Sequence, residues 1–198
     1  MMTIGLTGGI GMGKTPVANM LRNMGFPVHS ADAVVKEEYE PGGAAYAFVR
    51  DGWPEMLKDD LVDGNKWGNF VFNHPDVLEK LEKILHPLVE KSEQAFLQQA
   101  REKAARAAVL EIPLLFETGA EKRCDITLCA TASANVQKSR VLLRKNMNEE
   151  KFNAILAKQW PNDKKCQKAD YTVPTDCSFA ETEKHLRDLL IGLGLLDK

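Results

Sequence analysis

Apolar residues along the chain form two kinds of pattern, which alternate. Short continuous apolar runs at 2–7, 107–113 and 125–130 are typical of strands buried in a parallel sheet. Helical spacing of apolar residues follows the first run at 16–24 and returns at the end of the chain, at 179–196. Strands that alternate with helices predict an α/β fold with a doubly wound parallel sheet and right-handed connections.

The middle of the chain departs from this simple alternation. A short second strand is expected at 26–29, and a helix begins near residue 33. Residues 40–75 are rich in glycine, proline and aromatic side chains and predict short helices and loops. From 75 to about 103 an apolar stripe at helical spacing predicts a long helix that is interrupted near Pro87.

The composition bounds the size and class of the protein. A chain of 198 residues can form one core with room for a small inserted subdomain. Its net charge of −2 comes from 26 basic and 28 acidic side chains that are intermixed, so no nucleic-acid partner is expected. No stretch approaches the roughly 20 apolar residues of a membrane span, which predicts a cytoplasmic protein without membrane contact. We expect a monomer, with weak self-association left open.

Residues 8–15 satisfy the phosphate-binding pattern G-x-x-x-x-G-K-[ST], and we call them the phosphate loop. Glycines let the backbone curl so that its N–H groups point inward, Lys14 reaches the β- and γ-phosphates, and Thr15 would hold a Mg²⁺ ion. The loop lies between an apolar strand and a helix, whose N-terminus favours anions. A glycine-rich turn that binds nothing, or a dinucleotide-type loop, is the alternative. The nucleotide contacts expected here are Gly9, Ile10, Gly11, Met12, Gly13, Lys14, Thr15 and Pro16.

Pro16, directly after Thr15, is unusual at this position. Proline has no N–H and a fixed φ, and both properties are tolerated in the first turn of a helix. We therefore expect the fold to accept Pro16, while a donor to the α-phosphate is lost and nucleotide affinity is lowered.

Three further features are candidates for chemistry. Asp32 follows a predicted strand, and ligands bind at the carboxyl ends of strands in open α/β sheets; capping of the next helix is the alternative role. His86 lies at the expected interruption of the long helix, where a lone histidine more often has a structural role. Arg140 and Arg144 share one face of a charged helical segment at 136–159 and can grip phosphate oxygens, unless they form a solvated basic face.

Several segments in order along the chain resemble the dephospho-coenzyme A kinase family. The match covers nearly the whole chain, and the His-Pro and Pro-Leu-Leu-Phe-Glu segments are its most specific parts. The segments are Ile4-Gly5-Leu6-Thr7-Gly8-Gly9-Ile10-Gly11, Ala31-Asp32, Leu85-His86-Pro87-Leu88-Val89, Ile112-Pro113-Leu114-Leu115-Phe116-Glu117, residues 137–144 and Ala169-Asp170-Tyr171.

This resemblance implies transfer of the ATP γ-phosphoryl group to the ribose 3′-hydroxyl of dephospho-coenzyme A, the last step of coenzyme A synthesis. It implies a fold similar to nucleoside monophosphate kinases, as one P-loop kinase domain with three parts. These are a core at 1–30, 105–135 and 166–198, a helical substrate subdomain at 31–104 and a lid at 136–165.

The resemblance also assigns roles to residues. Asp32 would orient the 3′-hydroxyl and accept its proton, while Lys14, Arg140 and Arg144 would neutralise the transferred group. ATP and Mg²⁺ are the implied cosubstrate and metal. The residues expected to contact dephospho-coenzyme A are Asp32, His86, Leu114 and Glu117.

The chain departs from the family's pattern at four places. Ser30 replaces an aspartate, Lys66 is the only base near the Asp63-Gly64 turn where an arginine is usual, and Glu111 replaces an aspartate. Pro16 replaces a hydroxyl residue. Two other functions therefore stay open: a non-catalytic nucleotide-binding regulator with the same fold, and a kinase of another small hydroxyl acceptor.

Overall fold

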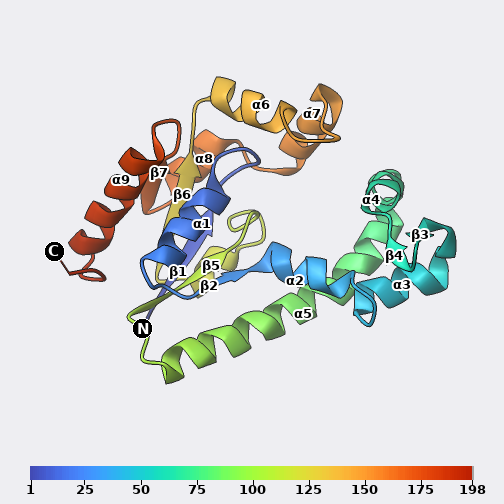
Figure 1. Ribbon diagram of the computed structural model, residues 1–198, viewed down its shortest axis with the longest axis horizontal. Helices are drawn as coiled ribbons and strands as arrows, with labels where there is room; N and C mark the ends of the chain where they lie inside the picture. Colours follow the sequence, from blue (N-terminus) through green and yellow to red (C-terminus); the bar gives the residue numbers. More distant parts are fainter. Residues whose placement is uncertain (198) are drawn as a thin grey trace. The chain divides into compact units, whose positions relative to one another are not determined.

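The computed structural model describes residues 1–197 and contains a five-stranded sheet with the order β2-β5-β1-β6-β7 (Figure 1). Strand β1 (Met2–Thr7) lies at the centre, between β5 (Ala107–Glu111) and β6 (Ile126–Thr131). The edges are β2 (Val28–Ser30), which starts later than the predicted 26, and β7 (Tyr171–Pro174), which the apolar pattern did not indicate.

The central strands run parallel, as the continuous apolar runs predict. In β1, Ile4 lies opposite Val109 of β5 and Ile126 of β6, and β6 pairs in parallel with β7. All five residues of β5 are buried, which is the pattern of a strand covered on both faces.

Helices cover both faces of the sheet, so the doubly wound prediction is confirmed. Alternate residues of β1, Ile4 and Leu6, join a core cluster with apolar residues of α1 (Lys14–Asn23) and α9 (Phe179–Gly192). On the opposite face Cys129 of β6 contacts Cys166 of α8 (Asn162–Lys168), with 3.8 Å between the sulfurs.

The charged segment predicted as helical at 136–159 consists of two helices, α6 (Ala134–Leu142) and α7 (Glu149–Lys158). Asn146 between them has a φ of 64°, a left-handed conformation that stops a helix. Asn148 then caps α7, because its side chain accepts a hydrogen bond from the Lys151 N–H at 2.8 Å. The predicted continuity was wrong because two asparagines favour a turn over a helix interior.

The chain divides into two compact units, which we describe separately. Unit 1 comprises Met1–His29 and the chain from Gln99 onward, and unit 2 is Ser30–Gln98. The helices and strands of unit 2 are α2 (Ala31–Glu38), α3 (Ala44–Gly52), η1 (Pro54–Met56), β3 (Leu57–Lys58), β4 (Leu61–Val62), α4 (Gly64–Asn73) and most of α5 (Pro75–Glu102), while η2 (Ala120–Arg123) belongs to unit 1.

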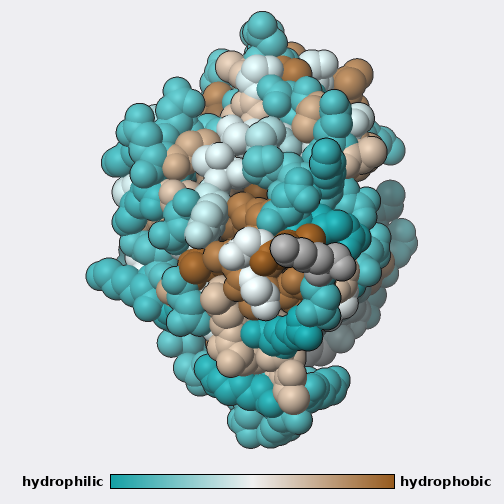
Figure 2. Space-filling model, turned by 90° about the vertical axis from the view of Figure 1, so that its left-hand side faces the viewer, coloured by the Kyte–Doolittle hydropathy of each residue, from teal (hydrophilic) through white to brown (hydrophobic). Residues whose placement is uncertain are grey.

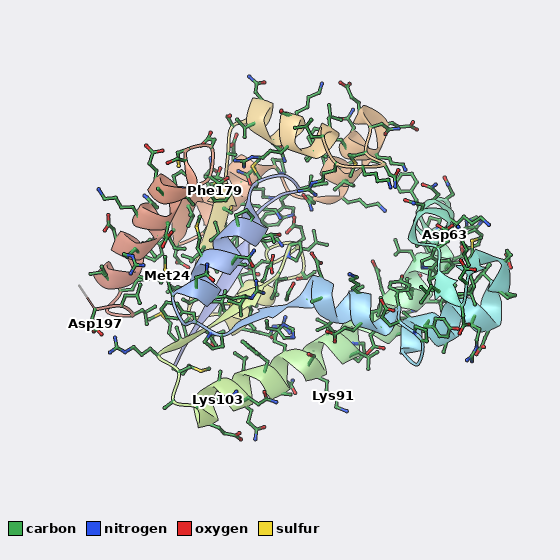
Figure 3. All side chains as sticks on the ribbon, viewed as in Figure 1. Met24, Asp63, Lys91, Lys103, Phe179 and Asp197 are labelled. Atoms are coloured by element: carbon green, nitrogen blue, oxygen red, sulfur yellow. The ribbon has the colours of Figure 1, made fainter. Side chains whose placement is uncertain are left out.

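Unit 2 has its own apolar core, built on aromatic side chains. Trp67 is buried between Trp53 and Phe70, whose ring centroids lie 5.5 and 5.7 Å from its own. Its indole N–H donates to the Tyr39 hydroxyl at 3.0 Å. Asp63 caps α4 by accepting hydrogen bonds from two backbone N–H groups of the first turn (Figure 3). The glycine-rich segment at 40–75 thus forms short helices, as expected, and also an antiparallel hairpin of β3 and β4.

Helix α5 is continuous through Pro87, so the expected interruption is absent. A proline inside a helix leaves the carbonyl four residues earlier without its usual donor. Pro87 is exposed, so water can reach that carbonyl, while Leu81 and Leu85 are buried in the core of unit 2. Burial of the apolar stripe outweighs the lost hydrogen bond.

The surface is mainly hydrophilic on the face drawn in Figure 2, with a small group of hydrophobic residues gathered near the end of α9. Leu193 and Leu196 belong to this part of the chain and are half-buried against the core cluster of unit 1. Within residues 1–197, every helix is too short or too polar to cross a membrane.

Candidate functional site

The phosphate loop connects β1 to α1, and its backbone curls at glycines. Gly11 and Gly13 have φ values of 77° and 83°, which side chains other than glycine rarely adopt. A Cβ on Gly13 would lie 2.6 Å from Thr175 Oγ1, and one on Gly11 would lie 2.6 Å from Val141 Cγ2. Glycine is therefore required at both positions by conformation and by space.

Helix α1 begins at Lys14, so its N-terminus opens directly into the phosphate loop. Pro16 lies in the first turn, where an N–H has no helical partner, and the helix continues from Val17 N–H to the Gly13 carbonyl at 3.2 Å. The expectation that the fold accepts Pro16 is met. The free N–H groups and the dipole of α1 make this end a site for anions.

Lys14 lies at the carboxyl edge of the sheet, paired with the last residue of β5. Its Nζ is 2.8 Å from Glu111 Oε1, and the carboxylate is buried with a side-chain exposure of 6%. A flexible ammonium held beside the loop in this way can exchange the carboxylate for a phosphate oxygen without leaving the site.

Thr15 provides the oxygen donor that a magnesium ion would use beside the phosphate loop. Thr15 is exposed, and among residues 1–197 its hydroxyl makes no hydrogen bond. In the same part of the chain, His, Cys, Asp and Glu form no cluster of three that could hold a metal by itself. A single exposed hydroxyl is a donor of the kind that Mg²⁺ accepts, since this ion keeps several waters and takes few protein ligands together with substrate phosphates.

A cavity of about 260 Å³ opens beside the helix end of the loop. Gly11, Gly13 and Pro16 of the loop region form one wall, and Arg140 and Arg144 of the predicted lid form another. Phe179, which Figure 3 labels, is 73% exposed at the start of α9. It also lines the cavity. The remaining lining residues are Met20, Thr175, Cys177 and Thr182.

Thr175 joins the loop to Arg140 and was not recognised from the sequence. Its hydroxyl donates to the Met12 carbonyl at 2.9 Å and accepts from Arg140 Nη1 at 3.0 Å, while Arg140 Nη2 donates to its carbonyl. Arg140 Nη1 also lies 3.5 Å from the Gly11 carbonyl. Thr175 directly follows β7, and no local pattern in the sequence marks its contact with Met12, 163 residues earlier.

Two glutamines contact the loop on its other side, and neither was a predicted site residue. Gln137 Nε2 donates to the Ile10 carbonyl at 2.8 Å, and Gln159 Oε1 accepts from the Ile10 N–H at 2.9 Å. Arg144, four residues after Arg140, is exposed at the cavity rim.

Glu117 and Leu114 lie in the turn after β5. Glu117 Oε1 accepts from the Trp160 N–H at 2.7 Å and from Lys165 Nζ at 2.9 Å, and its Oε2 is buried without a hydrogen-bond partner among residues 1–197. Leu114 is 37% exposed, and its carbonyl accepts from Thr118. In this structure Glu117 contacts the segment that carries Gln159.

Asp32 and His86 belong to unit 2. Asp32 is exposed in the first turn of α2, and among the described residues nothing hydrogen-bonds to its carboxylate. Ser30 occupies the N-cap of α2, so Asp32 does not cap this helix. His86 is exposed on α5, and Lys66 lies in the first turn of α4.

Comparisons with known proteins agree on one family. The model of the family described as dephospho-CoA kinase matches residues 2–181. A dephospho-CoA kinase of Brucella melitensis is 40% identical over 194 residues, covering 98% of this chain and 96% of the relative. One of Paramagnetospirillum magneticum is 46% identical over 165 residues, covering 83% of this chain and 78% of the relative.

Solved structures extend the likeness to three dimensions. A crystal structure of a Thermus thermophilus protein has a TM-score of 0.81 at 31% identity and covers 97% of both chains. Dephospho-CoA kinase from Campylobacter jejuni has a TM-score of 0.68 at 23% identity, with 98% of both chains covered, and shows the shared fold. With the family model spanning most of its length, the chain belongs to the dephospho-CoA kinase family.

Proposed function

We propose that this chain transfers the γ-phosphoryl group of ATP to the ribose 3′-hydroxyl of dephospho-coenzyme A, the last step of coenzyme A synthesis. The observation that carries the proposal is the phosphate loop with Lys14 beside it, in a chain of the dephospho-CoA kinase family. The protein would act as a monomer in the cytoplasm.

The cavity beside Pro16 is the proposed place of the adenosine part of ATP. The guanidinium of Arg140 is held by Thr175 in the lining of this cavity, so we propose that it stacks on the adenine ring instead of neutralising the transferred group, the role that the resemblance implies. The triphosphate would run from the cavity along the N-terminus of α1. There the loop N–H groups and Lys14 would bind its oxygens, and Arg144, which lines the cavity, would bind the phosphates from the lid.

Thr15 is the proposed magnesium ligand, because its hydroxyl is exposed and unengaged at the start of α1. Held there, a Mg²⁺ ion would neutralise charge on the transferred group. The chain's own part is to present the Thr15 hydroxyl and to leave room for the waters that complete the metal's coordination.

Asp32 is the proposed base. A carboxylate with no internal hydrogen bond can accept one from the 3′-hydroxyl of the acceptor, which orients that oxygen and takes its proton during transfer. His86, Leu114 and Glu117 are proposed contacts of dephospho-coenzyme A.

The proposed domain organisation follows from these roles. Residues 31–104 would hold the acceptor, 136–165 would act as a lid, and the rest of the chain would form the core. Closure of the lid would exclude water, which otherwise competes with the 3′-hydroxyl for the phosphoryl group.

The test is a kinase assay of the purified chain with MgATP and a panel of acceptors. Dephospho-coenzyme A should gain one phosphoryl group at the ribose 3′-position, which mass spectrometry and ³¹P NMR would detect. Nucleoside monophosphates, nucleosides and shikimate should react far more slowly. Faster phosphorylation of another acceptor would replace the acceptor assignment, and binding of both substrates without turnover would identify a non-catalytic regulator instead.

A further inference from the structure

Gln159 lies in the connection between α7 and α8, far in sequence from the phosphate loop that it contacts. Its Oε1 accepts from the Ile10 N–H at 2.9 Å. Gln137 of α6 contacts the carbonyl of the same loop residue at 2.8 Å. Ile10 is therefore held on both sides of its backbone by carboxamides.

The hydrogen bond from the Ile10 N–H determines the orientation of the Gln159 carboxamide. The oxygen end faces a donor, so the NH₂ group lies at the opposite end, and no residue from 1 to 197 accepts a hydrogen bond from it. A Cβ on Gly9 would lie 3.4 Å from Gln159 Oε1, so the carboxamide packs directly on the loop. The NH₂ group therefore has a defined orientation and can donate hydrogen bonds to a ligand.

The backbone next to Gln159 is anchored. The Trp160 N–H donates to Glu117 Oε1 at 2.7 Å, and the same oxygen pairs with Lys165 Nζ at 2.9 Å. Lys165 is fully buried and also donates to the Pro113 carbonyl at 2.8 Å. The turn after β5 thus holds both the residue after Gln159 and the helix that follows it, which limits the motion of the carboxamide.

The place of Ile10 in the loop indicates which phosphate this donor faces. The cavity for the nucleoside lies at the helix end, against Gly13 and Pro16, and its lining includes neither Ile10 nor Gln159. A triphosphate that starts in the cavity and passes the N-terminus of α1 would bring its terminal group toward the strand end of the loop, which contains Ile10 and lies next to the pair of Lys14 and Glu111.

We propose that Gln159 is a catalytic residue that donates a hydrogen bond from its NH₂ group to the terminal phosphoryl of ATP. The proposal rests on the proposed function, because it requires ATP on the loop. A neutral donor held in place before the reaction stabilises charge on the transferred group without reorganisation at the moment of transfer.

The test compares Gln159→Met with Gln137→Met by calorimetric binding of MgATP and MgADP without an acceptor. Both variants lose one hydrogen bond to Ile10, but only the first loses the proposed donor. Gln159→Met should weaken MgATP binding roughly tenfold or more, as for a hydrogen bond to a charged group, and leave MgADP within about twofold. Gln137→Met should change both affinities by the same factor.

Gln159→Glu adds a second measurement that does not depend on lost packing. Its carboxylate can still accept from Ile10, but it presents an anion to the terminal phosphate, so MgATP binding should fall further than in Gln159→Met. The assignment would be overturned if Gln159→Met weakened MgATP and MgADP equally, or if Gln159→Glu bound MgATP like the wild type. If the wild type binds MgATP and MgADP but leaves dephospho-coenzyme A unmodified, the proposed acceptor is refuted, and the nucleotide affinities of the variants still decide the role of Gln159. If the wild type binds neither nucleotide, both proposals are refuted.

Discussion

Pro16 removes one backbone donor from the helix end of the phosphate loop. It lies in the first turn of α1 and lines the cavity proposed for the nucleoside, where the innermost phosphate would pass. Pro16→Thr restores an N–H and adds a hydroxyl, so MgATP binding should tighten by up to roughly tenfold in calorimetry. Pro16→Ala restores the N–H alone and separates the two contributions. Unchanged affinity in both variants would show that the proline ring costs this site nothing.

The reactivity of Cys177 can test whether the nucleoside binds in the same cavity. Cys177 is exposed and lines the cavity. Cys129 is buried, and its burial raises the pKa of its thiol far above the usual range, with a smaller contribution from the neighbouring Cys166 thiol. Since the thiolate is the reactive form, iodoacetamide should modify Cys177 well before Cys129. MgATP should slow the modification of Cys177 severalfold, as followed by peptide mass spectrometry. Cys124, which does not line the cavity, serves as the internal control; equal protection of both would argue against a nucleoside in this cavity.

At the residue scale, the sequence predicted what a local pattern can encode. Gly13 and Lys14 follow from the spacing of the phosphate-loop pattern, and in the structure Gly13 has a positive φ and Lys14 pairs with Glu111. Gln159 was not predicted, because it contacts Ile10 across 149 residues of sequence and a glutamine has no local pattern that marks such a contact. Thr175 was missed for the same reason.

At the element scale, errors arose where a local preference competed with packing. The hairpin of β3 and β4 was missed because its turn residues, Asp59 and Asp60, have φ values of 51° and 60° without the glycine that usually marks such a turn. The interruption predicted at Pro87 was wrong because burial of the apolar stripe stabilises α5 as a continuous helix. The parallel strands were predicted well because burial on both faces leaves a continuous apolar run.

The N-terminus of α9 is closed by a capping box that can be tested directly. Ser178 Oγ accepts from the Glu181 N–H, and the Glu181 side chain accepts from the Ser178 N–H at 2.9 Å. Ser178→Ala should lower the free energy of unfolding by about 1 kcal/mol in urea denaturation, and Ser178→Thr should retain most of it. An unchanged midpoint for Ser178→Ala would show that the cap does not stabilise α9.

The same capping box gives a pH dependence with a defined sign. Hydrogen bonds from the hydroxyl and the N–H of Ser178 hold the pKa of Glu181 below its ordinary value of 4.5. Because the folded pKa is depressed, this contribution is present above pH 4.5 and is lost as the pH falls through the folded pKa. The stability difference between wild type and Ser178→Ala should therefore shrink as the pH falls below 4.5 and through the folded pKa of Glu181. A difference that grows instead would contradict the assignment.

Lys165 connects α8 to the turn after β5 through a buried ion pair. Its ammonium is fully buried and bonds Glu117 Oε1 and the Pro113 carbonyl. Lys165→Met leaves the Glu117 carboxylate without its counter-ion and should lower the free energy of unfolding by about 3 kcal/mol in chemical denaturation. The neighbouring Lys164 is exposed over the Trp160 ring, so Lys164→Met should cost less than about 1 kcal/mol. Equal effects of the two variants would argue against a structural role of the buried pair.

At the scale of the whole molecule, the proposed base lies in a different unit from the groups proposed for ATP, while two proposed acceptor contacts, Leu114 and Glu117, lie in the same unit as the phosphate loop. The phosphate loop, Arg140 and Gln159 belong to unit 1, and Asp32 and His86 belong to unit 2. The family resemblance implies a substrate subdomain at 31–104, which remains a proposal, and compact unit 2 spans Ser30–Gln98. Its end falls inside α5, where a continuous helix gives no signal of a boundary in the sequence.

This separation predicts that catalysis and ATP binding can be uncoupled by one substitution. Asp32→Asn removes the proposed base but no group of unit 1, so the kcat for dephospho-coenzyme A should fall by roughly 10²- to 10⁴-fold while the Kd for MgATP stays the same. Asp76→Asn is the matched control, since Asp76 also lies in the first turn of a helix, and it should behave like the wild type. Steady-state kinetics and calorimetry on the three proteins make the comparison. If the Asp32→Asn variant kept the wild-type kcat, Asp32 would not be the base. If the variant lost MgATP affinity in proportion to its loss of kcat, Asp32 would act on the nucleotide, and unit 1 alone would not bind ATP.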